Sequence, residues 1–232
     1  PFLDFRESLS NKRFMSALLI ANFVLIPLLV WALTRGLAEH PAVLIGALLV
    51  LLTPCIDYVV VFTHIGRGDS RAILAATPIL LLLQLALLPV YLAFMLGEQS
   101  QVVISIAPFA EAFLALIVVP LLLAVATAAL AKRSRIVGRW NTVWAWMPVP
   151  AMAAVLIAVV GSQISPVVRD IDQLLPVIPV YIGFMLLAPV VGALASRAYK
   201  LPSSTARAVT FSTSTRNSLV VLPLALALPE EI

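Results

Sequence analysis

The sequence contains little charge for its size. Only 11% of its 232 residues are Asp, Glu, Lys or Arg, whereas 62% are hydrophobic and the mean hydropathy is +1.09. A soluble domain of this length has too little interior to hide so much apolar surface, so lipid must be part of its solvent. The apolar stretches are continuous rather than alternating, which excludes a membrane β-barrel. The composition therefore predicts an all-α polytopic membrane protein.

Residues that build cofactor and metal sites are also scarce. The single cysteine, Cys55, excludes an internal disulfide, and the two histidines, His40 and His64, lie at opposite ends of one apolar segment. A membrane-embedded enzyme would need a nucleophile with its base, or a set of metal ligands, within the spans. The sequence therefore predicts no cofactor and favours a protein that is not an enzyme.

One short motif is nevertheless typical of an enzyme. Gly66-Arg67-Gly68-Asp69 matches the GxGD pattern of intramembrane aspartyl proteases. We reject this interpretation because Asp69 lies beside two arginines in a polar connection, and the partner Tyr-Asp pair in another span is missing. Glycine-rich polar turns commonly end helices, so we predict a turn here.

Long apolar runs are abundant. Seven of them cover residues 14–34, 41–63, 72–96, 105–131, 142–161, 174–196 and 205–228. If each run crosses the bilayer once, twelve Lys and Arg residues fall on one side and only Arg35 and Arg169 on the other. The positive-inside rule then places the N-terminal stub and the 132–139 loop in the cytoplasm, in a multi-pass protein of the cell membrane. The basic residues orient the chain in lipid and imply no nucleic-acid partner.

The second run, PAVLIGALLVLLTPCIDYVVVFT, is not an ordinary span. Its middle contains Thr53, Pro54, Cys55 and Asp57. Proline removes a helical hydrogen bond and clashes with the preceding turn, which predicts a helix break near Pro54. An acid at bilayer depth costs at least a few kcal/mol, so Asp57 should face protein or a water-filled cavity.

The seventh run is interrupted in a similar way by seven polar residues, Ser212, Thr213, Ser214, Thr215, Arg216, Asn217 and Ser218. The two broken runs are five segments apart and therefore cross in opposite directions. Each follows a short polar turn that ends in proline, Pro41 or Pro202. This pattern predicts an inverted-repeat transporter fold, in which two discontinuous helices cross at the bilayer midplane and form a transport site.

An inverted repeat of five helices gives ten spans, of which seven are present. We therefore expect a single transmembrane transporter domain over residues 1–232 that is a fragment of a longer protein. Residues 14–96 would be the end of the first repeat and residues 105–228 most of the second. Two spans would precede Phe14 and one would follow Leu228.

Three stretches, LLTPCIDYVVVFTHIGRGD, LLLQLALLPVYLAFMLG and FSTSTRNSLVVLPLALALP, resemble the arsenical-resistance (arsenite efflux) permeases of the bile acid/arsenite/riboflavin transporter superfamily. The resemblance extends in order over essentially the whole chain. It implies a core domain with two crossing helices, a panel domain, and secondary active efflux of arsenite or As(OH)3 by proton antiport. In these permeases the first crossing helix carries a required cysteine, and Cys55 occupies that position.

One position departs from the family pattern. The second crossing helix of these permeases carries a glutamate after its polar run, and the corresponding residue here is Leu219. Because that acid would carry the coupling ion, we predict that Asp57 replaces it and exchanges partners with Arg216 during transport. A static ion pair that only locks the two helices is the alternative.

The predicted site follows from the chemistry of the cargo. Trivalent arsenic exchanges hydroxyl for thiolate, so Cys55 is the predicted ligand of transported As(III), and a nearby cation would increase its thiolate fraction. Packing as a small buried apolar residue is the alternative for this cysteine. The other predicted substrate ligands are Thr53, Ser214, Thr215, Arg216 and Asn217, and the predicted ion-coupling residues are Asp57, Ser212 and Ser218.

Sodium-coupled symport of an organic anion, as in bile-acid-like relatives, is the alternative function. Arg216 would pair with a carboxylate, and the N-termini of half-helices favour anions. The sequence shows no clear cluster of acids for two sodium sites. The predicted partners are thus membrane lipid, arsenite or a small organic anion, and H⁺, with Na⁺ as the alternative ion.

Overall fold

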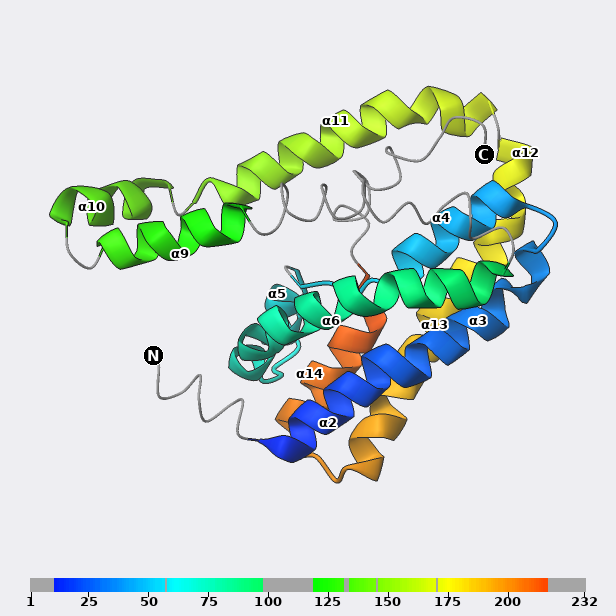
Figure 1. The fold of residues 1–232 in the computed structure, drawn as a ribbon, viewed down its shortest axis with the longest axis horizontal. Coiled ribbons are helices and arrows are strands. Elements are labelled where there is room, and N and C mark those ends of the chain that lie inside the picture. Colours follow the sequence, from blue (N-terminus) through cyan, green and yellow to red (C-terminus); the bar gives the residue numbers. More distant parts are fainter. Residues whose placement is uncertain are drawn as a thin grey trace. The chain divides into compact units, whose positions relative to one another are not determined.

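The computed structural model describes residues 11–56, 58–97, 119–131, 134–144, 146–169 and 171–216 (Figure 1). These residues form helices and no β-strand, which confirms the predicted all-α class. The chain divides into two compact units: unit 1 is Pro1–Ser105 with Pro176–Ile232, and unit 2 is Ile106–Leu175. Both broken runs belong to unit 1. The inverted repeats expected in residues 14–96 and 105–228 stay a prediction.

Within the described residues, two helical stretches, Lys12–Leu37 and Leu175–Ala198, are long and apolar enough to cross a membrane. A third, Ser70–Leu96, also qualifies when its two bent arms are counted as one span. These three stretches correspond to the first, sixth and third predicted runs. The chain is therefore an α-helical membrane protein.

The first span is continuous but not uniform. It consists of α2 (Lys12–Ile20), the π-helical turn η1 (Ala21–Leu25), α3 (Ile26–Thr34) and the 3-10 turn η2 (Arg35–Leu37). Pro27 has no N–H to donate to the carbonyl of Phe23, four residues earlier. The Tyr91 hydroxyl donates to that carbonyl instead, with an O–O distance of 2.6 Å. A neighbouring helix thus satisfies the backbone group that the proline leaves free.

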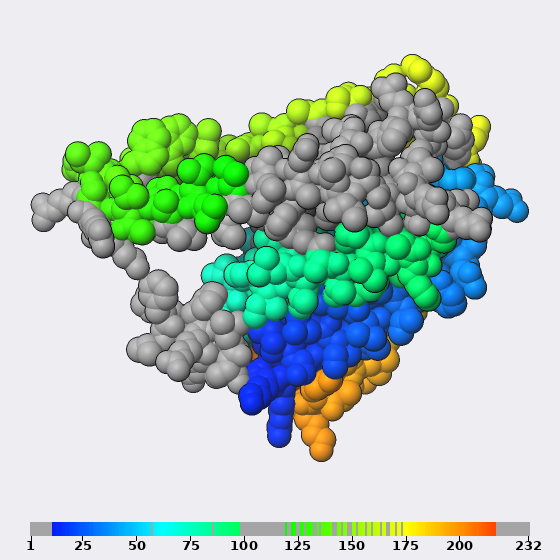
Figure 2. Space-filling view, in the orientation of Figure 1, coloured from blue at the N-terminus to red at the C-terminus, as the bar shows by residue number. Residues whose placement is uncertain are grey.

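Tyr91 belongs to α6 (Ser70–Leu96), which lies along α2 and α3 on one face of unit 1 (Figure 2). The arms Ser70–Gln84 and Ala86–Leu96 are bent by 47°. The bend falls at Leu85, whose carbonyl is the one that Pro89 leaves without its helical donor. Proline thus shapes this helix as well.

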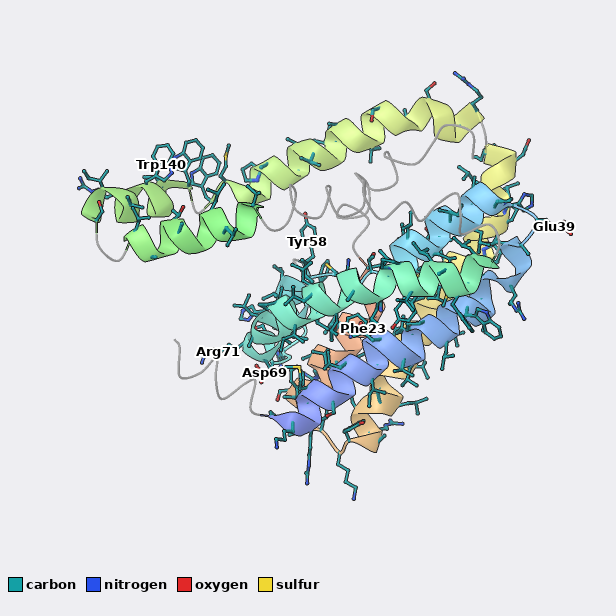
Figure 3. The ribbon with its side chains drawn as sticks, in the orientation of Figure 1. Phe23, Glu39, Tyr58, Asp69, Arg71 and Trp140 are labelled. Atoms are coloured by element: carbon teal, nitrogen blue, oxygen red, sulfur yellow. The ribbon has the colours of Figure 1, made fainter. Side chains whose placement is uncertain are left out.

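The connection before α6 confirms the predicted turn. The Asp69 carboxylate accepts a hydrogen bond from the backbone N–H of Ala72 at 3.0 Å and so caps the start of α6. The backbone N–H of Asp69 donates to the carbonyl of Ser204 at 3.0 Å. Asp69 and Arg71 lie at the same end of unit 1 (Figure 3). The acid of the GxGD match is therefore a helix cap.

Two further helices of unit 1 pack closely: α13 (Ile178–Ala198) and α14 (Ser203–Ser214). A Cβ added to Gly192 of α13 would lie 2.3 Å from Thr213 Oγ1 and 2.7 Å from Thr210 Cα. The Thr213 hydroxyl also donates across the contact to the carbonyl of Ala188 at 3.2 Å. The contact therefore requires glycine at position 192, as is typical of small residues between membrane helices.

Unit 2 contains α9 (Val119–Ala131), α10 (Arg135–Trp144), α11 (Pro148–Arg169) and α12 (Ile171–Leu174), and the 3-10 turn η5 (Leu175–Val177) leads into α13. The sequence predicts one apolar segment over 142–161. That boundary is wrong, because α11 begins only at Pro148. Proline is favoured in the first turn of a helix, where its missing N–H has no intrahelical partner to lose.

The residues before Pro148 form a separate amphipathic helix, α10. Its Ile136 and Trp140 side chains are exposed, and the Trp140 and Trp144 rings lie 5.3 Å apart between centroids (Figure 3). Tryptophan settles at membrane–water interfaces, so these exposed rings suit an interfacial position for α10.

The close approach of α13 and α14 leads to a stability prediction. Gly192→Ala places a methyl group against the backbone of Thr210, so we expect a loss of about 1–3 kcal/mol from overpacking. The matched control is Gly46→Ala in α4 (Pro41–Leu51), where an added Cβ meets nothing within 4 Å. Alanine is the better helix former, so this control should be neutral or stabilising. Thermal unfolding of both variants in detergent tests the contact, and equal melting temperatures would contradict it.

Candidate functional site at the crossing of two broken helices

The first broken run forms two short helices. α4 ends at Leu51, α5 (Tyr58–Ile65) begins seven residues later, and Pro54 lies between them. The Thr53 hydroxyl donates to the carbonyls of Leu49 and Val50, both at 3.0 Å, and so supplies a donor to carbonyls at the C-terminal end of α4. The predicted break near Pro54 is confirmed.

The second broken run ends its helix inside the polar sequence. α14 stops at Ser214, and Thr215 adopts an extended backbone with φ −98° and ψ 132°. The Ser214 hydroxyl donates to the carbonyl of Thr210 at 2.6 Å, and the Thr215 hydroxyl donates to that of Phe211 at 2.7 Å. Such bonds from side chain to backbone compete with helix continuation. The donors of these two predicted substrate ligands are therefore engaged within α14.

The two breaks pair with each other. Pro54 and Arg216 form an isolated antiparallel β-bridge, in which the backbone N–H of Cys55 donates to the carbonyl of Thr215 at 3.1 Å. Backbone groups freed from a helix within a membrane need partners in the protein. The break after α4 supplies a donor and the end of α14 supplies its acceptor, so the two breaks meet as predicted. The continuation of the second broken run after Arg216 lies outside the described residues, so the crossing of two discontinuous helices stays a prediction.

Arg216 brings a positive charge to the crossing. One of its terminal nitrogens, Nη2, donates to the carbonyl of Thr213, and its guanidinium carbon lies 5.1 Å from the ring centroid of Phe184 on α13. The Arg216 side chain as a whole is half-buried, but its Nε and Nη1 atoms are buried and have no hydrogen-bond partner among the described residues. The guanidinium therefore has donors left for another group.

Asn22 is a residue of the site that the sequence interpretation missed. It lies in the π-helical turn η1, and its amide nitrogen donates to the Leu18 carbonyl and to the Ser212 hydroxyl oxygen, both at 3.0 Å. Its amide oxygen is buried and has no partner among the residues that the structure describes. Single π-helical turns frequently occur at functional sites. The available signal was one amide side chain in an apolar span.

Cys55 combines two features. Its backbone takes part in the crossing, whereas its side chain is 2% exposed and packs in an apolar cluster with Phe14, Val59 and Ile73. This burial agrees with the alternative interpretation of Cys55 as a small apolar residue. In the described part of the chain, no group of three or more His, Cys, Asp or Glu side chains is arranged to hold a metal ion.

Three predicted site residues, Asp57, Asn217 and Ser218, lie outside the described residues. The proposed approach of Asp57 to Arg216 therefore stays a prediction. Of the others, backbone contacts bring together Pro54, Cys55, Thr215 and Arg216, whereas Ser212 is bonded to Asn22 of the first span.

The bond between Asn22 and Ser212 leads to a second prediction. In a double-mutant cycle, Asn22→Ala and Ser212→Ala should couple by about 0.5–1.5 kcal/mol, the range expected for a hydrogen bond between membrane helices. The control pair is Asn22→Ala with Thr34→Ala. Thr34 bonds to the carbonyl of Val30 in its own helix, so this pair should be additive. The coupling is measured from the unfolding free energies of the single and double variants in bicelles. If the effects of Asn22→Ala and Ser212→Ala are additive, the bond between these residues contributes nothing to stability.

Comparison with known proteins identifies the family of the chain. A search among curated proteins found no match. Residues 1–170, which include the first broken run, match the model of a family described as Sodium Bile acid symporter family. The match supports the superfamily recognised from the sequence and does not select its arsenical-resistance branch. Because it covers well over half of the 232 residues, the chain belongs to the sodium bile acid symporter family, a family of transporters.

Proposed function

We propose that the protein is a secondary active transporter of small organic anions and that Arg216 binds the anion at the helix crossing. The observation that carries this proposal is the buried pair of guanidinium donors, Nε and Nη1, for which the described residues provide no acceptor. The family description, which names a bile acid and sodium, agrees with an organic anion as cargo.

The energetics of burial favour an anion at this position. A buried charge is costly unless it is paired and hydrogen-bonded. Among the described residues, one carbonyl of Thr213 and the face of Phe184 neutralise Arg216 only in part. A carboxylate or another oxyanion supplies both the missing acceptors and the opposite charge. Arg216 therefore suits an anionic cargo better than a neutral one.

The N-terminus of a helix adds to the positive electrostatic potential of Arg216. α5 begins at Tyr58, four residues after Pro54 of the bridge (Figure 3). The N-terminus of a helix carries partial positive charge and unpaired N–H groups, which stabilise anions. Arg216 and the start of α5 thus both favour negative charge near the crossing.

The test is uptake of labelled taurocholate, a bile acid anion, by the protein in proteoliposomes. Arg216→Gln should reduce uptake by about 30-fold or more, because the buried charge that pairs with the anion is lost. Arg216→Lys keeps the charge but not the planar fork, so it should retain part of the activity.

The control for this experiment is Arg207→Gln. Arg207 lies on the same helix but is bonded at an exposed position to the carbonyl of Gly66, at 3.3 Å. Its uptake should match that of the wild type. Equal uptake by the Arg216→Gln and Arg207→Gln proteins would rule out Arg216 as the anion site.

Arsenite or As(OH)3 efflux by proton antiport is a second candidate. Two observations support it: the resemblance to arsenical-resistance permeases and the place of Cys55 in the crossing. The burial of the thiol ranks it second, because As(III) reaches Cys55 only if the crossing opens. Proton coupling through Asp57 and a cytoplasmic location of the 132–139 loop belong to this proposal.

Everted vesicles under a proton gradient distinguish this candidate. If Cys55 binds As(III), arsenite accumulation should disappear in both Cys55→Ser and Cys55→Ala, since both remove the thiol and only alanine preserves the apolar packing. Asp57→Asn should uncouple accumulation from the gradient. Accumulation that survives in Cys55→Ala would exclude the thiol as the ligand.

A further inference from the structure

The crossing contains the negative end of a half-helix. α14 stops at Ser214, so the carbonyl of Thr213 in its last turn has no N–H of α14 to accept from. The C-terminal end of a helix favours positive charge. In transporters with broken helices, such ends and the unwound carbonyls beside them are where a co-transported cation is coordinated.

A cation that belongs to the chain already occupies this position. Arg216 lies two residues beyond the end of α14, and its Nη2 donates to the carbonyl of Thr213. The β-bridge with Pro54 fixes the backbone of Arg216, so the guanidinium is held at the helix end by two independent contacts.

We infer that Arg216 is a built-in counter-cation: its guanidinium takes the place of a co-transported cation at the end of α14, so the site binds its anion without Na⁺. A second positive charge a few ångströms from a buried guanidinium would be repelled strongly, because the interior screens charge poorly. The remaining donors, Nε and Nη1, have no acceptor among the described residues and so can bind the anion.

Removing the guanidinium should expose a sodium site. The Thr213 carbonyl would lose its donor, Ser212 precedes it in the chain, and the Asn22 side chain is bonded to Ser212 and has a buried amide oxygen without a described partner. Carbonyl, hydroxyl and amide oxygens are the ligands that hard cations prefer. We therefore expect Arg216→Ala to bind Na⁺ where the wild type does not.

The experiment measures the melting temperature of the detergent-solubilised protein in NaCl, with choline chloride at the same ionic strength as the reference. The wild type should show no sodium-specific change. Arg216→Ala should gain about 3–5 °C at ten times its dissociation constant for Na⁺. Arg216→Lys, which keeps a tethered cation, should behave as the wild type.

Arg207→Ala is the matched control, since it removes an arginine that also donates to a carbonyl but lies at the exposed end of α14. It should remain insensitive to Na⁺. Saturable, sodium-specific stabilisation of the wild type would overturn the inference, and so would a folded Arg216→Ala protein that ignores Na⁺.

If Arg216→Ala does not fold, the same melting temperatures of the wild type and Arg216→Lys test the inference. A sodium-specific rise in either protein would contradict it. The inference rests on the proposed function in one respect only, namely that the bound anion is transported without Na⁺. The melting experiment needs no substrate. A failure of taurocholate uptake would therefore contradict the proposed cargo and leave the sodium result intact.

Discussion

The backbone pairing of the two helix breaks is the constraint on which the rest of unit 1 depends. A helix interrupted within lipid exposes N–H and carbonyl groups that have no water to bind. Residues far apart in the chain solve this problem together, because Cys55 donates to Thr215 and Pro54 pairs with Arg216. Either break alone would leave unsatisfied groups, so the two half-helix ends must meet. Their pairing places a group of polar backbone atoms inside an apolar protein.

The surrounding helices hold this pairing in place by similar means. Tyr91 satisfies the Phe23 carbonyl that Pro27 leaves free, and Gly192 lets α13 approach α14 to backbone contact. The π-helical turn η1 carries Asn22, whose amide bonds to Ser212 beside the crossing. These irregularities of the first span and of α13 therefore each have a partner in another helix, which is how a membrane protein tolerates proline and polar residues.

The chemical character of the crossing is set by Arg216 more than by Cys55. The guanidinium presents buried donors, whereas the thiol is packed among apolar side chains. The sequence favours a site centred on Cys55, because soft-ligand chemistry and family resemblance both point to the cysteine. Charge and burial reverse that order and favour an anionic cargo. The same charge at the C-terminal end of α14 gives the arginine a second role as a fixed counter-ion.

The sequence by itself determined the class, the first span, the break near Pro54 and the turn that contains Asp69, because hydropathy, proline chemistry and glycine-rich turns act within a few residues of the chain. It also indicated which two runs are broken. Only the tertiary structure decided that the breaks pair, that Asn22 bonds to Ser212 and that the Cys55 thiol is buried. These features join residues as many as 190 positions apart, and no local pattern specifies such partners. The sequence does not locate the start of α11 at Pro148, because the apolar residues from Val143 to Met147 continue the run on the N-terminal side of that proline.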